Sequence, residues 1–70
     1  MWQMSFLQTK DLLRSFGILI YTGDAIGDCL LMEDEIKELH EAGLIDSDIF
    51  RAALMAIRQR TAELKENLSI

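Results

Sequence analysis

The chain lacks proline and contains one cysteine and one histidine. The lone Cys29 excludes an internal disulfide, and together with His40 it offers too few ligands for a four-coordinate zinc site. Long apolar runs are missing as well, because the longest, residues 52–57, is far shorter than the roughly 20 residues of a membrane-spanning helix. These absences predict a protein with no metal site, no cofactor and no membrane partner.

Basic charge is scarce in the middle of the chain. Residues 24–48 carry nine acidic side chains and one basic one, Lys37, whereas the flanks carry six basic residues and three acidic ones. The net charge of −5 therefore combines an acidic centre with two mildly basic ends. This division bears on binding partners, because charge patterning decides which surfaces attract one another.

The 70 residues suffice for one small domain, and half of them are hydrophobic, which is typical of a folded chain. A core of this size barely offsets the conformational entropy lost on folding. Without disulfide or metal, regular helices and self-association remain as sources of stability. The first residues do not have the pattern of a signal peptide, and a single thiol fits a reducing compartment, so a cytoplasmic protein is expected.

The first expected helix spans roughly residues 6–16. Ser5 and Gln8 match the S-x-x-Q capping box, and Gly17 suits the left-handed position just past a helix end. The apolar stripe of this helix comprises Phe6, Leu12, Leu13 and Phe16 and is interrupted by the polar Thr9. Residues 18–22 are rich in β-branched and aromatic side chains but have no second strand to pair with, so we expect an extended, buried connection.

The second expected helix spans roughly residues 25–42. Asp24 is a suitable N-cap whose charge complements the helix dipole, and Gly43 ends the helix. Its outward face carries most of the acidic charge, with an i,i+4 ion pair expected between Glu33 and Lys37. Its inward face is expected to contain Ile26, Cys29, Leu30, Met32, Ile36 and Leu39.

The third expected helix spans roughly residues 47–68. Asp46 is its natural N-cap, and Ile45 and Phe50 have the spacing of a hydrophobic staple. At 1.5 Å per residue the helix is about 30 Å long, so its end either projects or packs on another copy. The apolar residues at helical spacing are Phe50, Ala53, Leu54, Ile57, Leu64 and Leu68.

Short loops between the helices favour antiparallel neighbours. The predicted fold class is therefore all-α, a small three-helix bundle with short loops that forms the single domain 1–70. Within this class, the second and third helices belong either to a regular bundle or to a long hairpin with the first helix laid across it.

No group of residues has the spacing of a catalytic or cofactor site. Cys29 and His40 lie about three turns apart on one helix, so they do not form a nucleophile–base pair; Cys29 is expected in the core and His40 at the boundary. Residues 46–48 resemble the start of a calcium loop, but Arg51 stands where that loop requires glycine. Residues 23–27 lack the Gly-Lys-Ser/Thr ending of a P-loop. The chain is therefore expected not to be an enzyme.

Basic residues recur along the first and third expected helices. Those of the third are spaced by seven and share one stripe, and those of the first form an i,i+4 pair. If the two helices are neighbours, both sets line one groove, and an aromatic ring beside it offers a stacking surface for single-stranded RNA or DNA. The alternative is that these charges only balance the acidic second helix or keep the third helix soluble. The candidate binding residues are Lys10, Arg14, Arg51, Arg58, Lys65 and Tyr21, with Phe16 and Trp2 as alternative rings.

The N-terminal segment is unusually apolar, with Trp2, Met4 and Phe6 close together. Met1 and Trp2 pack either over the bundle or against a partner. A chain that is half hydrophobic has more apolar surface than one small core covers. Homodimerisation is therefore expected, and the acidic second helix together with an apolar patch is available to a protein partner.

Three blocks of sequence are distinctive in their order and spacing. They are Tyr-Thr-Gly-Asp at 21–24, Leu-Met-Glu-Asp-Glu-Ile-Lys-Glu-Leu at 31–39 and Gly-Leu-Ile-Asp at 43–46, preceded by Leu-Leu-Arg-Ser-Phe-Gly at 12–17. In these blocks the chain resembles the YqgQ-like family of short bacterial cytosolic proteins, over about residues 6–60. The resemblance implies a bundle of three helices and no known enzymatic activity, and single-stranded nucleic-acid binding has been suggested for the family. It implies no binding residues, so the basic stripes rest on spacing alone.

Two functions follow as hypotheses. The first is a non-enzymatic, self-associating interaction module, and the second is a binder of single-stranded nucleic acid. Salt distinguishes them, because binding through phosphate contacts weakens steeply as salt rises, whereas binding through an apolar patch does not.

Overall fold

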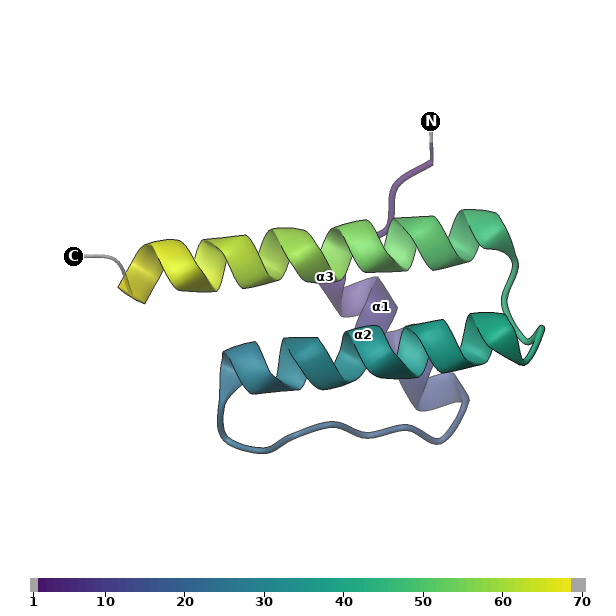
Figure 1. The fold of residues 1–70 in the computed structure, drawn as a ribbon, viewed down its shortest axis with the longest axis horizontal. Helices are drawn as coiled ribbons and strands as arrows, with labels where there is room; N and C mark the ends of the chain where they lie inside the picture. The colour runs from purple at the N-terminus through teal and green to yellow at the C-terminus, as the bar shows by residue number, and fades with distance from the viewer. Residues whose placement is uncertain (1, 69–70) are drawn as a thin grey trace.

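A computed structural model describes residues 2–68 and contains three helices and no strand within that range (Figure 1). The helices are α1 (Phe6–Ser15), α2 (Ala25–Glu41) and α3 (Ser47–Leu68). The predicted all-α, three-helix class is thereby confirmed. α2 and α3 form an antiparallel hairpin and α1 lies across one face of it, which is the second of the two expected arrangements (Figure 1).

Side-chain caps start two of the helices. The Gln8 N–H donates to Ser5 Oγ at 3.0 Å and the Ser5 N–H donates to Gln8 Oε1 at 2.9 Å, which completes the expected capping box of α1. The Ile49 N–H donates to Asp46 Oδ1 at 2.9 Å, so Asp46 caps α3. Asp24 occupies the N-cap position of α2, but its side chain makes no cap hydrogen bond. Its contribution to α2 is therefore limited to its charge near the helix dipole.

Glycine ends the first two helices. Gly17 and Gly43 have φ angles of 78° and 74°, in the left-handed region that side chains with a Cβ avoid. In both turns, the N–H of the residue after the glycine donates to a carbonyl five residues earlier, at 3.0 Å and 2.9 Å. This is the Schellman arrangement. Because it makes Phe16 and Ala42 the cap residues, α1 and α2 each end one residue before the expected boundary.

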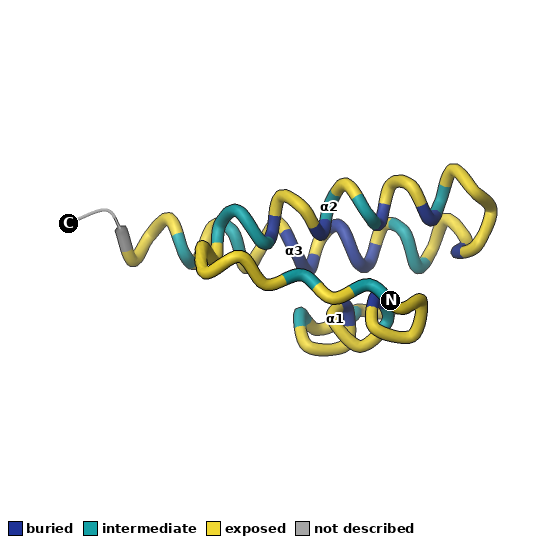
Figure 2. The backbone as a smooth tube through the Cα atoms, turned by 90° about the horizontal axis from the view of Figure 1, so that it is seen from below, coloured by how far each residue is buried: buried dark blue, intermediate teal, exposed yellow. Residues whose placement is uncertain are grey.

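The core lies where the three helices meet, along the sides of α2 and α3 that face each other and α1 (Figure 2). The expected placement of Cys29 in the core is seen, since its side chain is buried. Met1 and the side chain of Leu68, which the sequence analysis also assigned to packing, lie outside the described residues. The buried core residues are Leu13, Cys29, Met32, Ile36, Leu39, Ile45, Ala53, Leu54 and Ile57.

The inward faces expected for α1 and α2 need correction at three positions. Thr9, which interrupts the apolar stripe of α1, is fully buried, and it is tolerated there because its hydroxyl donates to the Ser5 carbonyl at 3.0 Å. Phe16 is exposed because it caps the helix rather than continuing it. Leu30 is 54% exposed, since the adjacent residue, Cys29, takes the buried position instead.

The connection between α1 and α2 is irregular and only partly buried. Ile18 and Ile20 are half-buried, whereas Leu19 and Tyr21 are exposed. The expectation of a buried connection is therefore wrong for every second residue. An extended chain points successive side chains to opposite sides, and only one side of this segment faces the bundle.

Candidate functional site

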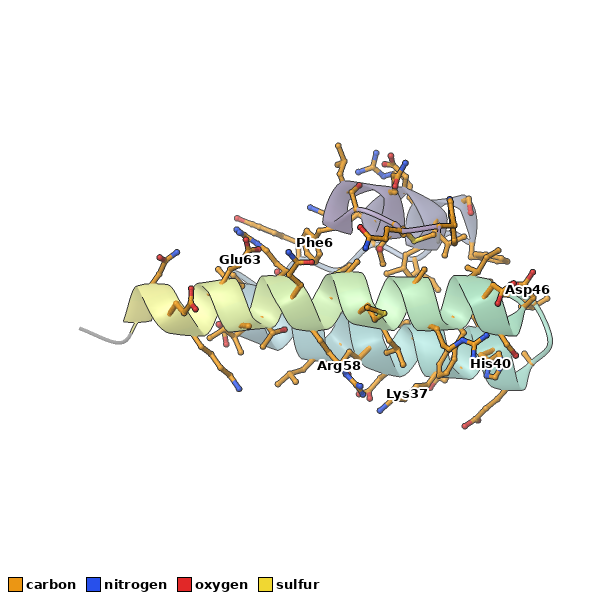
Figure 3. The ribbon with its side chains drawn as sticks, turned by 90° about the horizontal axis from the view of Figure 1, so that it is seen from above. Phe6, Lys37, His40, Asp46, Arg58 and Glu63 are labelled. Atoms are coloured by element: carbon orange, nitrogen blue, oxygen red, sulfur yellow. The ribbon has the colours of Figure 1, made fainter. Side chains whose placement is uncertain are left out.

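The structure places the predicted nucleic-acid-binding residues on two different faces. Phe6 of α1 and Arg58 of α3 lie on opposite sides of α3 (Figure 3). Since seven-residue spacing keeps the other two basic residues of the stripe beside Arg58, this stripe faces away from α1. The expected single groove between α1 and α3, lined by all five cations, is not formed. The two groups are Lys10, Arg14 and Tyr21 on one face and Arg51, Arg58 and Lys65 on the other.

Three of the predicted residues do come together, around a hollow of about 260 Å³. Lys10 and Arg14 border it from α1, and Tyr21, a residue that is 90% exposed, borders it from the connecting segment. The Arg14 guanidinium lies 4.0 Å from the Asp11 carboxylate, and both side chains are largely exposed. The remaining lining residues are apolar: Leu13, Ile18, Leu19, Ile20 and Met32. The hollow thus combines an apolar floor, two cations and an accessible aromatic ring.

Two local features of the sequence hold Tyr21 beside α1. The Schellman turn at Gly17 reverses the chain direction after α1, so that residues 18–21 line the same hollow as α1. At the far end, the backbone N–H and the hydroxyl of Thr22 both donate to Asp28 Oδ1, at 2.9 Å and 2.6 Å. This fastens the segment to the first turn of α2 and fixes the backbone next to the exposed ring.

The side of the α2–α3 hairpin that faces away from α1 carries a different arrangement, which we call the open face. Lys37 of α2 and Arg58 of α3 both point to this side (Figure 3). Residues three, four or seven positions away on each helix share the same side. The open face therefore consists of Leu30, Asp34, Lys37 and Glu41 from α2 and Arg51, Met55, Arg58, Ala62 and Lys65 from α3, all of them exposed.

Both arginines of the open face have acidic neighbours within the chain. Arg58 Nε lies 3.2 Å from Glu33 Oε1, and this glutamate side chain is only 14% exposed. Arg51 Nη2 lies 3.0 Å from Asp48 Oδ1, with both side chains largely exposed. The expected pairing of Glu33 with Lys37 is therefore wrong, because α3 brings Arg58 to the same carboxylate.

The contact between α1 and α3 contains a cation that the sequence analysis missed. The Arg60 guanidinium carbon lies 5.9 Å and the Lys10 ammonium nitrogen 6.0 Å from the centroid of the Phe6 ring. Such distances are within the range of cation–π attraction. Arg60 is off the seven-residue stripe of the other cations but seven residues after the fully buried Ala53. That spacing is the signal that could have placed it on the α1 side.

The apolar N-terminal segment packs along the start of α3. Trp2 borders a groove of about 880 Å³ together with Ile49, Ala52 and Met55, and the residue stays 59% exposed. Three charged residues complete the lining: Asp46, Asp48 and Arg51. Of the two placements expected for Trp2, the structure shows packing over the bundle, with more than half of the side chain still accessible.

Cys29 and His40, which their spacing excludes as a nucleophile–base pair, each pack against the bundle. Cys29 is buried, and His40 stacks on Phe50 with ring centroids 4.2 Å apart and planes inclined by 11°. Residues 2–68 hold no group of three or more His, Cys, Asp or Glu side chains arranged to bind a metal ion. Over the same range, no helix is both long and apolar enough to cross a membrane.

Comparisons with known proteins agree with the resemblance seen in the sequence. A sequence model of the YqgQ-like family matches residues 4–63. The chain is also 30% identical over 61 residues to a Bacillus subtilis (strain 168) protein described as uncharacterized protein YqgQ, and the alignment covers 87% of this chain and 86% of that protein. The chain therefore belongs to the YqgQ-like family.

Proposed function

We propose that this chain is a non-enzymatic binding module of the bacterial cytoplasm that associates with itself as a homodimer. The observation that carries the proposal is the open face of the hairpin. α1 covers one side of α2 and α3, while the other side exposes Leu30 at 54% and Met55 at 65%. Apolar side chains of this size lose unfavourable contact with water when a second surface covers them.

The residues with chemical reactivity support binding rather than catalysis. The Cys29 thiol is buried, and the His40 ring is engaged with Phe50 and has its Nε2 3.4 Å from Ser47 Oγ. A nucleophile must reach both its substrate and a base, and neither side chain is placed to do so. The acidic side of α2 offers the exposed carboxylates of Asp34 and Glu38, which suits a basic partner protein.

Sedimentation velocity on the full chain, repeated over a dilution series, tests self-association. We expect the weight-average mass to fall from twice that of the chain towards that of a single chain as the protein is diluted. Moderate salt should weaken the dimer less than it weakens binding through phosphate contacts, because part of the contact is apolar. A single-chain mass at every concentration would overturn the proposal.

A second candidate function is the binding of single-stranded nucleic acid, and the hollow between α1 and the connecting segment favours it. Lys10 and Arg14 are one helical turn apart, so they can contact neighbouring phosphates. The exposed Tyr21 ring beside them is available for base stacking, which contributes roughly 1–3 kcal/mol per base. The overall charge of −5 opposes long-range attraction, so binding is expected to be local and sensitive to salt.

Fluorescence anisotropy of labelled single-stranded RNA and DNA at low and moderate salt tests this second function. Lys10→Glu combined with Arg14→Glu should weaken binding at least about tenfold at low salt and flatten the salt dependence, by about 0.7 in log–log slope per lost phosphate contact. Arg51→Glu combined with Arg58→Glu changes the net charge equally but lies on the open face, and it serves as the matched comparison. Stronger loss in that comparison variant, or no binding to begin with, would contradict a site at the hollow.

A further inference from the structure

The two helices of the open face differ in the sign of the charge that they carry. α2 contributes the carboxylates of Asp34 and Glu41 and the single ammonium group of Lys37, whereas the charged groups of α3 on this face are all basic: Arg51, Arg58 and Lys65. An apolar or small residue accompanies each set, Leu30 on α2 and Met55 and Ala62 on α3. A surface with one acidic and one basic half is complementary to a second copy of itself.

We propose that two copies of this chain stack their open faces on each other, so that α2 of each copy lies against α3 of its partner. The result is a four-helix core with one α1 on each outer side. This inference rests on the proposed self-association and adds to it the face, the two-fold axis and the residues in contact. The axis runs parallel to the helices, because only that axis places acidic α2 over basic α3.

A second two-fold axis also lies in the plane between the two open faces, but it runs perpendicular to the helices. The charges disfavour this axis. It would stack α2 on α2 and α3 on α3. Asp34 and Glu41 would then face carboxylates, and Arg51 and Arg58 would face guanidinium groups. Like charges in direct opposition cost several kcal/mol across an interface, whereas the parallel axis gives opposite charges on both halves.

The hairpin itself sets the register of the contact. Within one chain, Glu33 is level with its ion-pair partner Arg58, and His40 is level with Phe50. A two-fold axis parallel to the helices does not change the position of a residue along them. Each residue of α2 therefore lies opposite the part of the partner's α3 that is at the same level. The rule places each α2 residue within one or two positions of an open-face residue of the partner's α3, which gives four opposed pairs: Leu30 with Ala62, Asp34 with Arg58, Lys37 with Met55, and Glu41 with Arg51.

These pairs are chemically consistent along the whole contact. Two of them join a carboxylate to a guanidinium, one joins two apolar side chains, and in the fourth the aliphatic stem of Lys37 can cover Met55. The contact also accounts for Leu30, which follows the apolar pattern of α2 yet is 54% exposed in the single chain. In the dimer this side chain is covered by α3 of the partner.

Charge exchange tests the register, with dimer dissociation constants measured by sedimentation equilibrium on the full-length chain. Arg51→Glu and Glu41→Arg should each weaken the dimer at least about tenfold, because each places like charges in opposition at two symmetric positions. The double variant with both substitutions restores opposite charges and should regain most of the affinity. Both residues are exposed, so the variants should keep their fold, which thermal denaturation monitored by circular dichroism checks.

Asp11→Arg on α1 is the matched control, since it changes the net charge as Glu41→Arg does but lies away from the open face. It should leave the dissociation constant unchanged. A dimer whose affinity responds to none of the open-face variants would overturn the proposed face while leaving self-association intact. A native chain that stays monomeric would overturn both, and the open face would then be left to a helix of a different protein.

Discussion

At the scale of single residues, the helical pattern identifies most of the core but does not identify the direction in which a boundary residue points. Ile36 and Leu30 both fit the apolar pattern of α2, yet Ile36 is fully buried and Leu30 is half exposed. Thr9 shows the opposite error, because a hydroxyl that bonds to the preceding turn can be buried without cost from an unsatisfied donor. Whether such a residue is buried depends on which side chains of other helices pack against it, and the periodicity of one helix does not contain that information.

Truncation of the two α2 residues measures this difference. Ile36→Ala should lower the free energy of unfolding by about 2–5 kcal/mol, since it removes buried methyl groups and leaves a cavity. Leu30→Ala should lower it by less than about 1 kcal/mol in dilute protein, because the side chain is already in contact with water. Urea denaturation followed by circular dichroism gives both values. Equal losses would mean that Leu30 is buried in the single chain after all.

At the scale of helices, the local signals were the most informative part of the sequence. The capping box at Ser5, the cap at Asp46 and the glycines at 17 and 43 lie where the pattern predicts, because caps and turns depend on residues close together in the chain. Asp24 illustrates the limit of such signals. Its residue type and position are right, but its carboxylate does not bond to the helix that it precedes.

The two aspartates form a matched pair for a test of capping. Asp46→Ala should cost about 1 kcal/mol of unfolding free energy, because it leaves the Ile49 N–H without its 2.9 Å acceptor. Asp24→Ala should cost only a few tenths of a kcal/mol, since only the dipole interaction is lost. Denaturant midpoints of the two variants, measured side by side, decide the question. A larger loss at Asp24 would contradict the capping assignments.

At the scale of the whole molecule, the sequence predicts the number of helices and their antiparallel hairpin but not the side of that hairpin on which α1 lies. For this reason the expected single groove between α1 and α3 is not formed. Lys10, Arg14 and Tyr21 meet because one short segment connects them, whereas Arg51 and Arg58 face the other way because α1 crosses the opposite side of α3. Contacts between helices that are distant in sequence depend on packing, and no local spacing encodes it.

The same placement of α1 leaves the open face uncovered by any helix within residues 2–68, and Trp2 borders only its Arg51 and Met55 end. In the proposed dimer a second copy covers this face, with Leu30 of one chain opposite Ala62 of the other. A disulfide forms only where Cβ atoms approach within about 4.5 Å. The buried native Cys29 stays out of reach of such a reaction.

The most direct measurement is therefore oxidative cross-linking of two single-cysteine additions. Chains carrying Leu30→Cys and chains carrying Ala62→Cys are oxidised separately and after mixing, and the products are resolved by non-reducing electrophoresis. The account predicts a cross-linked dimer in the mixture and almost none in either variant alone, because residue 30 faces residue 62 of the partner rather than its own counterpart. No dimer in the mixture, or efficient cross-linking of either variant with itself, would contradict the account.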